Sequence, residues 1–137
     1  VMLSSIARVP LHQSVAITGS LDVLGNTQPI GGVTDKIVGF FRVCERKGGL
    51  SGKQGVIIPW QNQKDLMLPK DVVLAIRSKK FHVWPVKTPE EALLVLTGEE
   101  PKEIERKAKE QLKRYFRIAQ KFSGNKGIFA QESSKEE

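Results

Sequence analysis

Residues 28–36 read Gln28-Pro29-Ile30-Gly31-Gly32-Val33-Thr34-Asp35-Lys36. The paired glycines after a proline-containing turn predict the start of a helix. Downstream, apolar residues recur at helical spacing at Val33, Ile37, Phe40, Phe41 and Cys44. Lys47-Gly48-Gly49 then places a basic residue in the last turn and glycine beyond it. We therefore expect one helix between Gly32 and Lys47, with a single apolar face.

The residues before this helix predict a β-hairpin. Ser14 to Leu24 is apolar and rich in β-branched side chains, which indicates a strand. Gly25-Asn26 marks a turn, and residues 28–30 form a short return arm that Pro29 confines to a sheet edge or strand end. Residues 1–6 are typical of the end of a helix that began upstream, broken by Pro10.

The residues after the helix alternate between strand and helix patterns. Strands are expected at residues 54–59 and 81–86, with a loop or short helix at 61–68 and a short helix at 71–77. Thr88-Pro89 resembles a helix cap followed by proline at the first helical position, and Gly98 ends that helix. This alternation predicts an α/β or α+β arrangement of layers.

A second, longer helix begins at Pro101, and its stripe contains Ile104, Ala108, Leu112, Tyr115, Ala119 and Phe122. Residues 101–126 carry nine basic and three acidic side chains, so most of the net charge of +7 lies there. The basic side chains could contact phosphates, or they could form a solvated face on a helix docked by its stripe. Residues 124–137 lack periodicity and are expected to be a flexible tail.

Composition limits the class of protein. A chain of 137 residues has the size of one domain, and no apolar run is long enough to span a bilayer. Cys44 is the only cysteine, which excludes an intrachain disulfide and favours a reducing, cytoplasmic compartment. With only His12 and His82 beside it, the chain has too few ligands for a structural zinc site.

Lys36 is the strongest candidate for chemistry. Its helical neighbours Gly32, Val33, Gly39 and Phe40 are all uncharged, so no local carboxylate can pair with it. A lysine stripped of water at the edge of an apolar face favours the neutral amine, which can act as a general base. The alternative is an edge lysine whose stem packs while its ammonium reaches water. The sequence leaves both interpretations open.

Other candidates have weaker signals. Thr18, at the end of a strand, could supply a hydroxyl to a site, or it could be an ordinary β-branched strand residue. Gly31 and Gly32 could form a phosphate-binding helix start, but neither Gly-x-Gly-x-x-Gly nor a Walker-type motif is present. His82 fits a plain strand position better than a metal ligand or a base.

These residues resemble a known family. Thr18-Gly19-Ser20-Leu21 followed by residues 28–36 is similar to the proteolytic domain of Lon-type ATP-dependent serine proteases. Two later blocks also match: residues 55–59 followed by Asn62, Asp65 and Leu66, and residues 81–86 with the helix through Leu96. The resemblance covers about residues 10–98, and the stretch from Cys44 to Lys53 looks more like the B-type or C-type branch.

The resemblance implies a fold, a chemistry and partners. The fold would be an α+β, ribosomal-protein-like two-layer sandwich without its N-terminal part, over residues 1–98, with the basic helix at 99–123 as an extension. The chemistry would be a Ser–Lys dyad in which Lys36 deprotonates the serine, Thr18 holds the lysine, and Gly31 and Gly32 support them. The substrates would be unfolded polypeptides. ATP and Mg²⁺ would bind a AAA+ module elsewhere in the protein, with no cofactor in this chain, and the subunits would form a hexameric ring.

One departure from the family pattern affects this interpretation. The family's nucleophile lies in a Gly-x-Ser-Ala-type segment well upstream of the hairpin, and residues 1–13 contain no match. Ser4 and Ser5 are too close to the hairpin, and Ser20 replaces an acidic residue common in the family. We therefore expect the serine to lie outside this chain and the chain alone to be inactive. The alternatives are a non-catalytic scaffold and a nucleic-acid-binding module that uses the basic helix.

Overall fold

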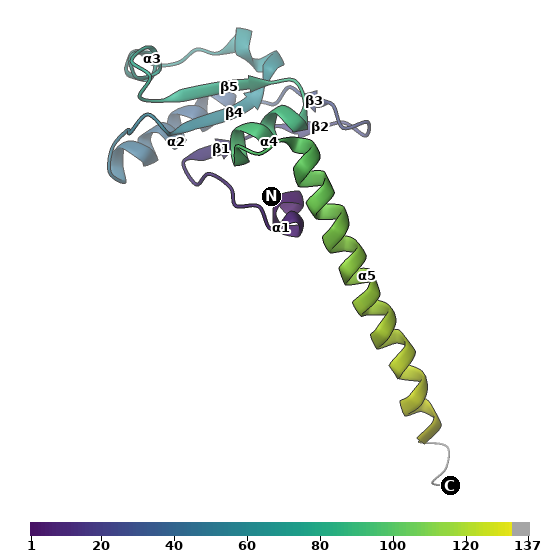
Figure 1. Cartoon of the computed structure of the whole chain (residues 1–137). Helices are drawn as coiled ribbons and strands as arrows, with labels where there is room; N and C mark the ends of the chain where they lie inside the picture. Colours follow the sequence, from purple (N-terminus) through teal and green to yellow (C-terminus); the bar gives the residue numbers. More distant parts are fainter. Residues whose placement is uncertain (133–137) are drawn as a thin grey trace. The chain divides into compact units, whose positions relative to one another are not determined.

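The computed structural model describes the backbone of residues 1–132 and the side chains of residues 1–122. Internal contacts divide the chain into two units (Figure 1). Residues 11–99 form the sheet unit, and residues 1–10 together with residues from 100 onward form the helical unit. The expected limits of the proteolytic-domain portion, residues 1–98, stay a prediction.

The sheet unit contains a parallel three-stranded sheet and a separate hairpin. The parallel sheet has the order β1-β4-β5, formed by Val15–Ile17, Gly55–Pro59 and His82–Val86. The hairpin pairs β2, Ser20–Leu21, antiparallel with β3, Thr27–Gln28. The structure thus confirms the strands expected at residues 54–59 and 81–86, and the hairpin around Gly25-Asn26. Its return arm is Thr27–Gln28 and not the predicted residues 28–30, because Pro29 lacks an N–H and the backbone of Ile30 bonds to Asn62.

The single strand predicted from Ser14 to Leu24 is wrong, because the chain divides it into β1 and β2. Gly55 N–H donates to the Ser14 carbonyl (3.2 Å), and Thr18 N–H donates to the Ile57 carbonyl (3.0 Å). The next bond in this parallel ladder would require an N–H on Pro59, which proline lacks. The pairing with β4 therefore stops after Thr18, and the chain turns away into the hairpin.

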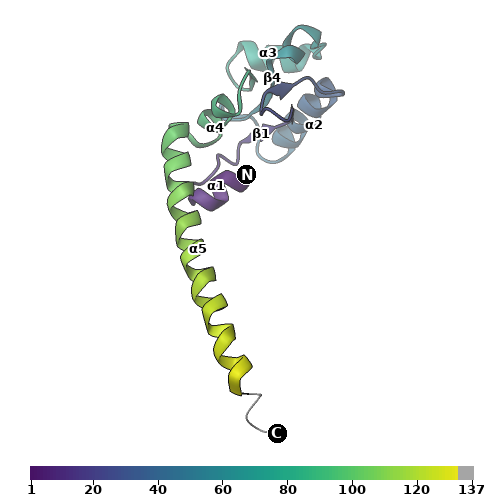
Figure 2. The same ribbon diagram turned by 90° about the vertical axis from the view of Figure 1, so that its right-hand side faces the viewer.

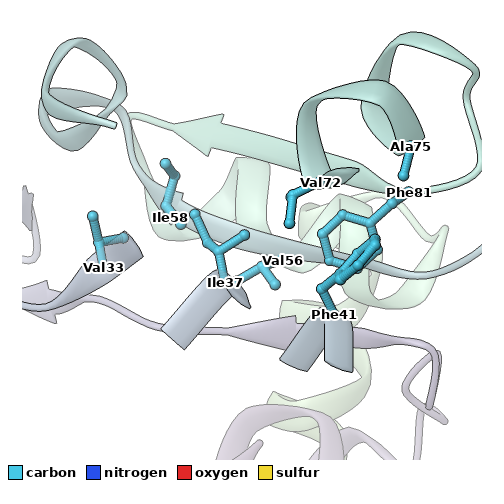
Figure 3. Close-up of a cluster of buried hydrophobic side chains, with 8 residues drawn as sticks. All are labelled: Val33, Ile37, Phe41, Val56, Ile58, Val72, Ala75 and Phe81. Carbon is cyan, nitrogen blue, oxygen red and sulfur yellow. The ribbon is translucent and has the colours of Figure 1, made fainter. Parts of the chain in front are cut away.

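Two helices cover one face of the parallel sheet. Helix α2, Val33–Arg46, and helix α3, Lys70–Arg77, enclose a common core with β4 and Phe81 (Figure 3). The shared core contains Val33, Ile37, Phe41, Val56, Ile58, Val72, Ala75 and Phe81. The rings of Phe41 and Phe81 meet edge to face, with centroids 5.2 Å apart. The predicted apolar face of α2 is therefore the face that closes the core.

The opposite face of the sheet is covered by helix α4, Pro89–Thr97. Ile57 points to this side and packs with Val86, Ala92 and Leu96. The predicted cap is confirmed, because the Thr88 hydroxyl accepts a hydrogen bond from Glu91 N–H (3.3 Å). The α+β class is also confirmed, and α4 adds a layer beyond the two that the family resemblance implied.

A short 3₁₀-helix, η1, occupies Trp60–Asp65 directly after β4. It lies in the region where the sequence left a choice between a loop and a short helix. Its Asn62 side chain is buried, although its neighbours in the segment are largely exposed. The segment therefore presents one fixed amide to the interior of the sheet unit.

The helical unit consists of α1, Met2–Ala7, packed against the first turns of α5, Pro101–Glu132 (Figures 1 and 2). Helix α1 ends at Arg8, which has φ 57°, before Pro10 is reached. Helix α5 continues past residue 123, where the sequence predicted its end. The glycines at 124 and 127 weaken a helix by about 1 kcal/mol each relative to alanine but do not by themselves end it. Residues 133–137 of the expected tail lie outside the described residues.

Candidate active site

Lys36 lies in the first turn of α2. Its N–H donates to the Gly32 carbonyl (3.2 Å), the first hydrogen bond of the helix. On the same turn Val33 and Ile37 are buried, whereas the Lys36 side chain is exposed. The structure therefore favours the interpretation in which the stem lies beside the apolar face and the ammonium reaches water.

No carboxylate approaches the Lys36 ammonium anywhere in the described part of the chain. The nearest acid in sequence, Asp35, is also exposed and forms no ion pair with it. This absence agrees with the uncharged helical neighbours noted in the sequence. Among the described residues, the Lys36 ammonium therefore has no ion-pair partner.

Gly32 sets the direction in which the helix starts. It is the residue immediately before α2 and has φ 64° and ψ 26°, in the left-handed region. Residues with a Cβ are strained there by about 1–2 kcal/mol. Gly31 has no such φ, and an added Cβ there would meet open space. Of the two supporting glycines, only Gly32 is required by the backbone.

Asn62 holds the segment that precedes Gly31 and Gly32. Ile30 N–H donates to Asn62 Oδ1 (3.0 Å), and Asn62 Nδ2 donates to the Ile30 carbonyl (2.9 Å). This two-way contact pairs both backbone groups of Ile30 with a buried side chain. Close by, Gln61 Nε2 donates to the Thr27 carbonyl (2.8 Å). Helix η1 therefore anchors the approach to the helix that carries Lys36.

Sequence reasoning quoted Asn62 as part of a family block but gave it no role. A polar residue three positions after a buried strand is the only local signal, and it is weak. Its partner, Ile30, lies far away in the sequence. The amide clamp becomes visible only when strand β4 is placed beside the start of α2.

Thr18 lies directly after β1, at the carboxyl end of the strand, and is half-buried. In a parallel unit the following helix begins at the edge of the sheet where the strand ends. Thr18 and the Lys36 turn therefore belong to the same edge of the sheet. No hydrogen bond joins the Thr18 hydroxyl to Lys36 among the described residues.

Of the two serines in the first helix, Ser4 presents no free hydroxyl, whereas Ser5 is exposed. Ser4 is buried, with 4% of its surface exposed, and its hydroxyl donates to the Val1 carbonyl (2.7 Å). Ser20 lies in β2 and is exposed. Among the described side chains, those of residues 1–122, no group of three or more His, Cys, Asp or Glu is arranged to hold a metal ion.

Comparison with protein families identifies the family of the domain that contains Thr18 and Lys36. Residues 1–97 match the model of the Lon protease (S16) C-terminal proteolytic domain. The chain belongs to this family. The match includes Thr18, Gly31, Gly32 and Lys36, and it ends before α5 begins.

Individual relatives agree with the family. The chain is 46% identical over 95 residues to a putative Lon protease homolog of Escherichia coli, a match that covers 69% of the chain. It is similarly 46% identical over 98 residues, or 72% of the chain, to a putative Lon protease homolog of Haemophilus influenzae. An archaeal Lon protease of Thermococcus kodakarensis is 34% identical over 116 residues, or 83% of the chain.

The matched segment is a small part of each relative, since it spans 16% of the length of all three proteins.

No helix in the described residues is both long enough and apolar enough to cross a membrane.

Proposed function

We propose that this chain supplies the general base of a Lon-type serine endopeptidase, and that the base is Lys36. The observation that carries the proposal is the placement of Lys36 on the first turn of α2, within the family match and without an ion-pair partner among the described residues. Gly32 and the Asn62 clamp support the same turn.

The proposed reaction uses two steps. The neutral Lys36 amine accepts the proton of a serine hydroxyl as the serine oxygen attacks a peptide carbonyl. The resulting ammonium returns the proton to the departing amine, which leaves an acyl-enzyme. In the second step Lys36 accepts a proton from water as the water oxygen attacks the acyl carbonyl. The ammonium then returns this proton to the serine oxygen as the acyl–serine bond breaks, which releases the new carboxyl end and restores the neutral amine. Thr18, at the same sheet edge, would hold the amine through its hydroxyl.

The serine in this proposal lies outside the chain. Ser4 is buried and bonded to its own helix start, so it does not present a free hydroxyl. The segment that carries this serine would also cover Lys36, which is exposed here, and would exclude water from its amine. The 137-residue chain alone is therefore proposed to be inactive.

The rest of the proposal concerns the whole protein. Its substrates are unfolded or damaged polypeptides, and ATP and Mg²⁺ act in a AAA+ module that is not part of these residues. The subunits assemble into a ring, and the compartment is the cytoplasm, for which the single free thiol of Cys44 is suited.

The test uses the protein that carries these residues together with the serine-bearing segment. Lys36→Ala should abolish casein hydrolysis while the circular dichroism spectrum stays unchanged. Lys47→Ala is the matched control, because Lys47 is an exposed lysine at the other end of α2. Casein hydrolysis that survives in Lys36→Ala would show that the base is another residue, and a wild-type protein that hydrolyses no casein would identify the domain as a scaffold.

A further inference from the structure

Helix α5 carries an apolar stripe that is covered at its beginning and bare afterwards. Ile104 and Ala108 are 0% and 3% exposed, in the part of the helix that contacts α1. Beyond residue 111 the same side of the helix is uncovered. We call its side chains the free face: Leu112, Tyr115, Phe116, Ile118, Ala119 and Phe122.

The free face is exposed to an unusual degree for residues of this type. Phe116 is 64% exposed and Phe122 is 72% exposed, and Leu112 is 50% exposed. Contiguous apolar surface of this kind marks a site of interaction more often than isolated exposed residues do. We therefore treat the free face as a binding surface and ask which kind of partner it fits.

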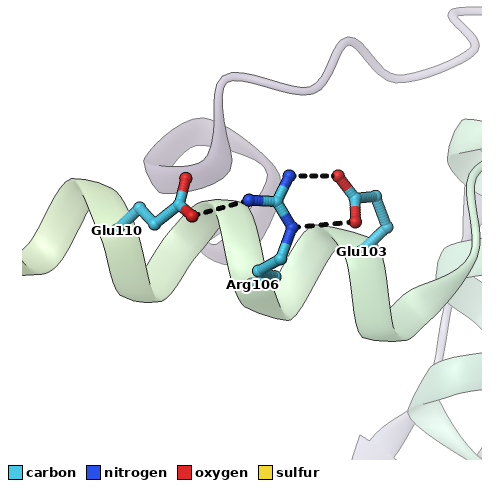
Figure 4. A network of polar contacts seen from close by, with 3 residues as sticks. All are labelled: Glu103, Arg106 and Glu110. Carbon is cyan, nitrogen blue, oxygen red and sulfur yellow. Dashed lines mark hydrogen bonds and ion pairs between the residues drawn. The ribbon is translucent and has the colours of Figure 1, made fainter.

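The charge pattern of α5 changes at the same position. In residues 101–111 three acids are interspersed with four bases, and Arg106 bonds to Glu103 (3.0 Å) and Glu110 (2.6 Å) (Figure 4). The hydrogen bond from Arg106 lowers the pKa of Glu103 below its ordinary value, so the Glu103 carboxylate is charged at neutral pH. Where α1 covers the stripe, the outer side of α5 is thus a neutralised, solvated surface.

Residues 112–122 contain no acid at all. Their four charges are positive, and we call them the basic face: Lys113, Arg114, Arg117 and Lys121. At 3.6 residues per turn, the free face spans an arc of about 160° and the basic face an opposite arc of about 100°. Apolar and basic side chains are therefore fully separated around this part of the helix.

The presence of an apolar face opposite a purely basic face discriminates between the possible binding partners of this part of α5. A second copy of the helix, or an apolar groove, would use the free face and give no reason for a basic-only outer side. A nucleic acid would use the basic face and leave the free face in water. A bilayer with anionic lipids uses both, because the acyl boundary accepts the apolar side while the negative surface potential acts on every cation within a Debye length.

We propose that residues 112–122 of α5 bind the surface of an anionic lipid bilayer, with the helix lying flat and the free face turned into the headgroup region. Lys113 and Arg114 stand at the borders of the basic arc, where long side chains can reach lipid phosphates. The described residues contain no helix that is both long enough and apolar enough to span the bilayer, which fits a peripheral contact. The proposal does not depend on the peptidase chemistry, since residues 112–122 lie outside the segment that the family model matches, residues 1–97.

Flotation of the whole 137-residue chain with lipid vesicles tests the proposal. Vesicles containing about 30% phosphatidylglycerol should carry the chain upward at least about tenfold better than pure phosphatidylcholine vesicles. High salt should reduce the binding, because it screens the attraction between exposed charges. Equal binding to both kinds of vesicle, or to neither, overturns the proposal.

Two pairs of variants separate the contributions of the two faces. Phe116→Gln with Phe122→Gln removes apolar area at little cost in helix propensity, and Met67→Gln is the control at an exposed apolar position of the sheet unit. We expect the double variant to float several-fold less than wild type and the control to float normally. Helix content measured by circular dichroism must be the same in all variants compared.

The second pair reverses charge. Arg117→Glu with Lys121→Glu should abolish flotation, whereas Lys79→Glu with Lys80→Glu makes the same change of net charge in the sheet unit and should leave flotation largely intact. Equal loss in both variants would reduce the effect to net charge and contradict the proposal. So would a chain that binds DNA or dimerises through the free face and shows no affinity for anionic vesicles.

Discussion

Gly32 shows how one residue can fix the geometry of a site. Its left-handed backbone turns the chain into α2 one turn before Lys36, and glycine is the residue that adopts this conformation without strain. The lysine is placed by the backbone that precedes it as much as by its own packing.

Gly32→Ala should therefore lower the free energy of unfolding by about 1–2 kcal/mol. Gly31→Ala is the matched control, since an added Cβ there meets nothing, and it should change stability by less than about 0.5 kcal/mol. Urea unfolding followed by tryptophan fluorescence measures both. Equal effects of the two substitutions would contradict the assignment of the strained position.

Asn62 provides a second test at the residue scale. Asn62→Ala leaves the N–H and the carbonyl of Ile30 without their partner, which should cost about 1–3 kcal/mol of stability. Gln63→Ala, at an exposed position of the same 3₁₀-helix, should stay within about 0.5 kcal/mol of wild type. A neutral Asn62→Ala in urea unfolding would mean that the clamp does not hold the approach to α2.

Cys44 gives a prediction that depends on pH. Burial raises the pKa of its thiol above the ordinary value, so less of the reactive thiolate exists in the folded chain near pH 8. Iodoacetamide should therefore modify Cys44 more slowly in the folded chain than in concentrated urea. The stabilisation by the protonated thiol is complete below the unfolded pKa and is lost as the pH rises through the folded pKa. Faster modification of the folded chain would contradict the burial.

At the scale of elements, local sequence patterns were sufficient to predict a helix that has its own cap, apolar face and terminating residues. The spacing of Val33, Ile37 and Phe41 predicted the buried face of α2, and Thr88 predicted the cap of α4. The division between β1 and β2 could not be predicted in this way. It depends on Pro59, which meets Thr18 only after two distant strands have paired.

The surroundings of the candidate site were also only partly predictable. The sequence indicated that Lys36 has no ion-pair partner on its own helix but could not decide how far water reaches it. The Asn62 clamp was missed because its partner is a backbone group, which leaves no signature in side-chain patterns. The stripe of α5 was predicted correctly as a stripe, but the sequence did not show that only its first part is covered.

Helix α5 is therefore expected to respond unevenly to substitution along its stripe. Ile104→Ala removes a fully buried side chain and should cost about 2–4 kcal/mol in the stability of the helical unit. Leu112→Ala removes a half-exposed side chain on the free face and should cost less than about 1 kcal/mol. Hydrogen exchange of α1 amides measures the difference. Equal loss of protection in both variants would show that the free face is covered after all.

At the scale of the whole molecule, the chain combines a family portion with an extension that the family model does not include. Residues 1–97 carry the Lon-type pattern, and α5 carries most of the net positive charge. The basic composition therefore describes the extension rather than the site. The chemistry that we propose depends on one lysine, Lys36, at the edge of a small parallel sheet.

The rate at which a fluorophosphonate probe labels the catalytic serine tests this role of Lys36 most directly, in the protein that carries these residues together with the serine-bearing segment. Probe labelling reports activation of the nucleophile without requiring unfolded substrates or ATP. Lys36→Ala should slow labelling by about 10²–10⁴-fold, and added ethylamine should restore part of the rate. Lys47→Ala should label at the wild-type rate. Labelling of Lys36→Ala at the wild-type rate would contradict the assignment of Lys36 as the base.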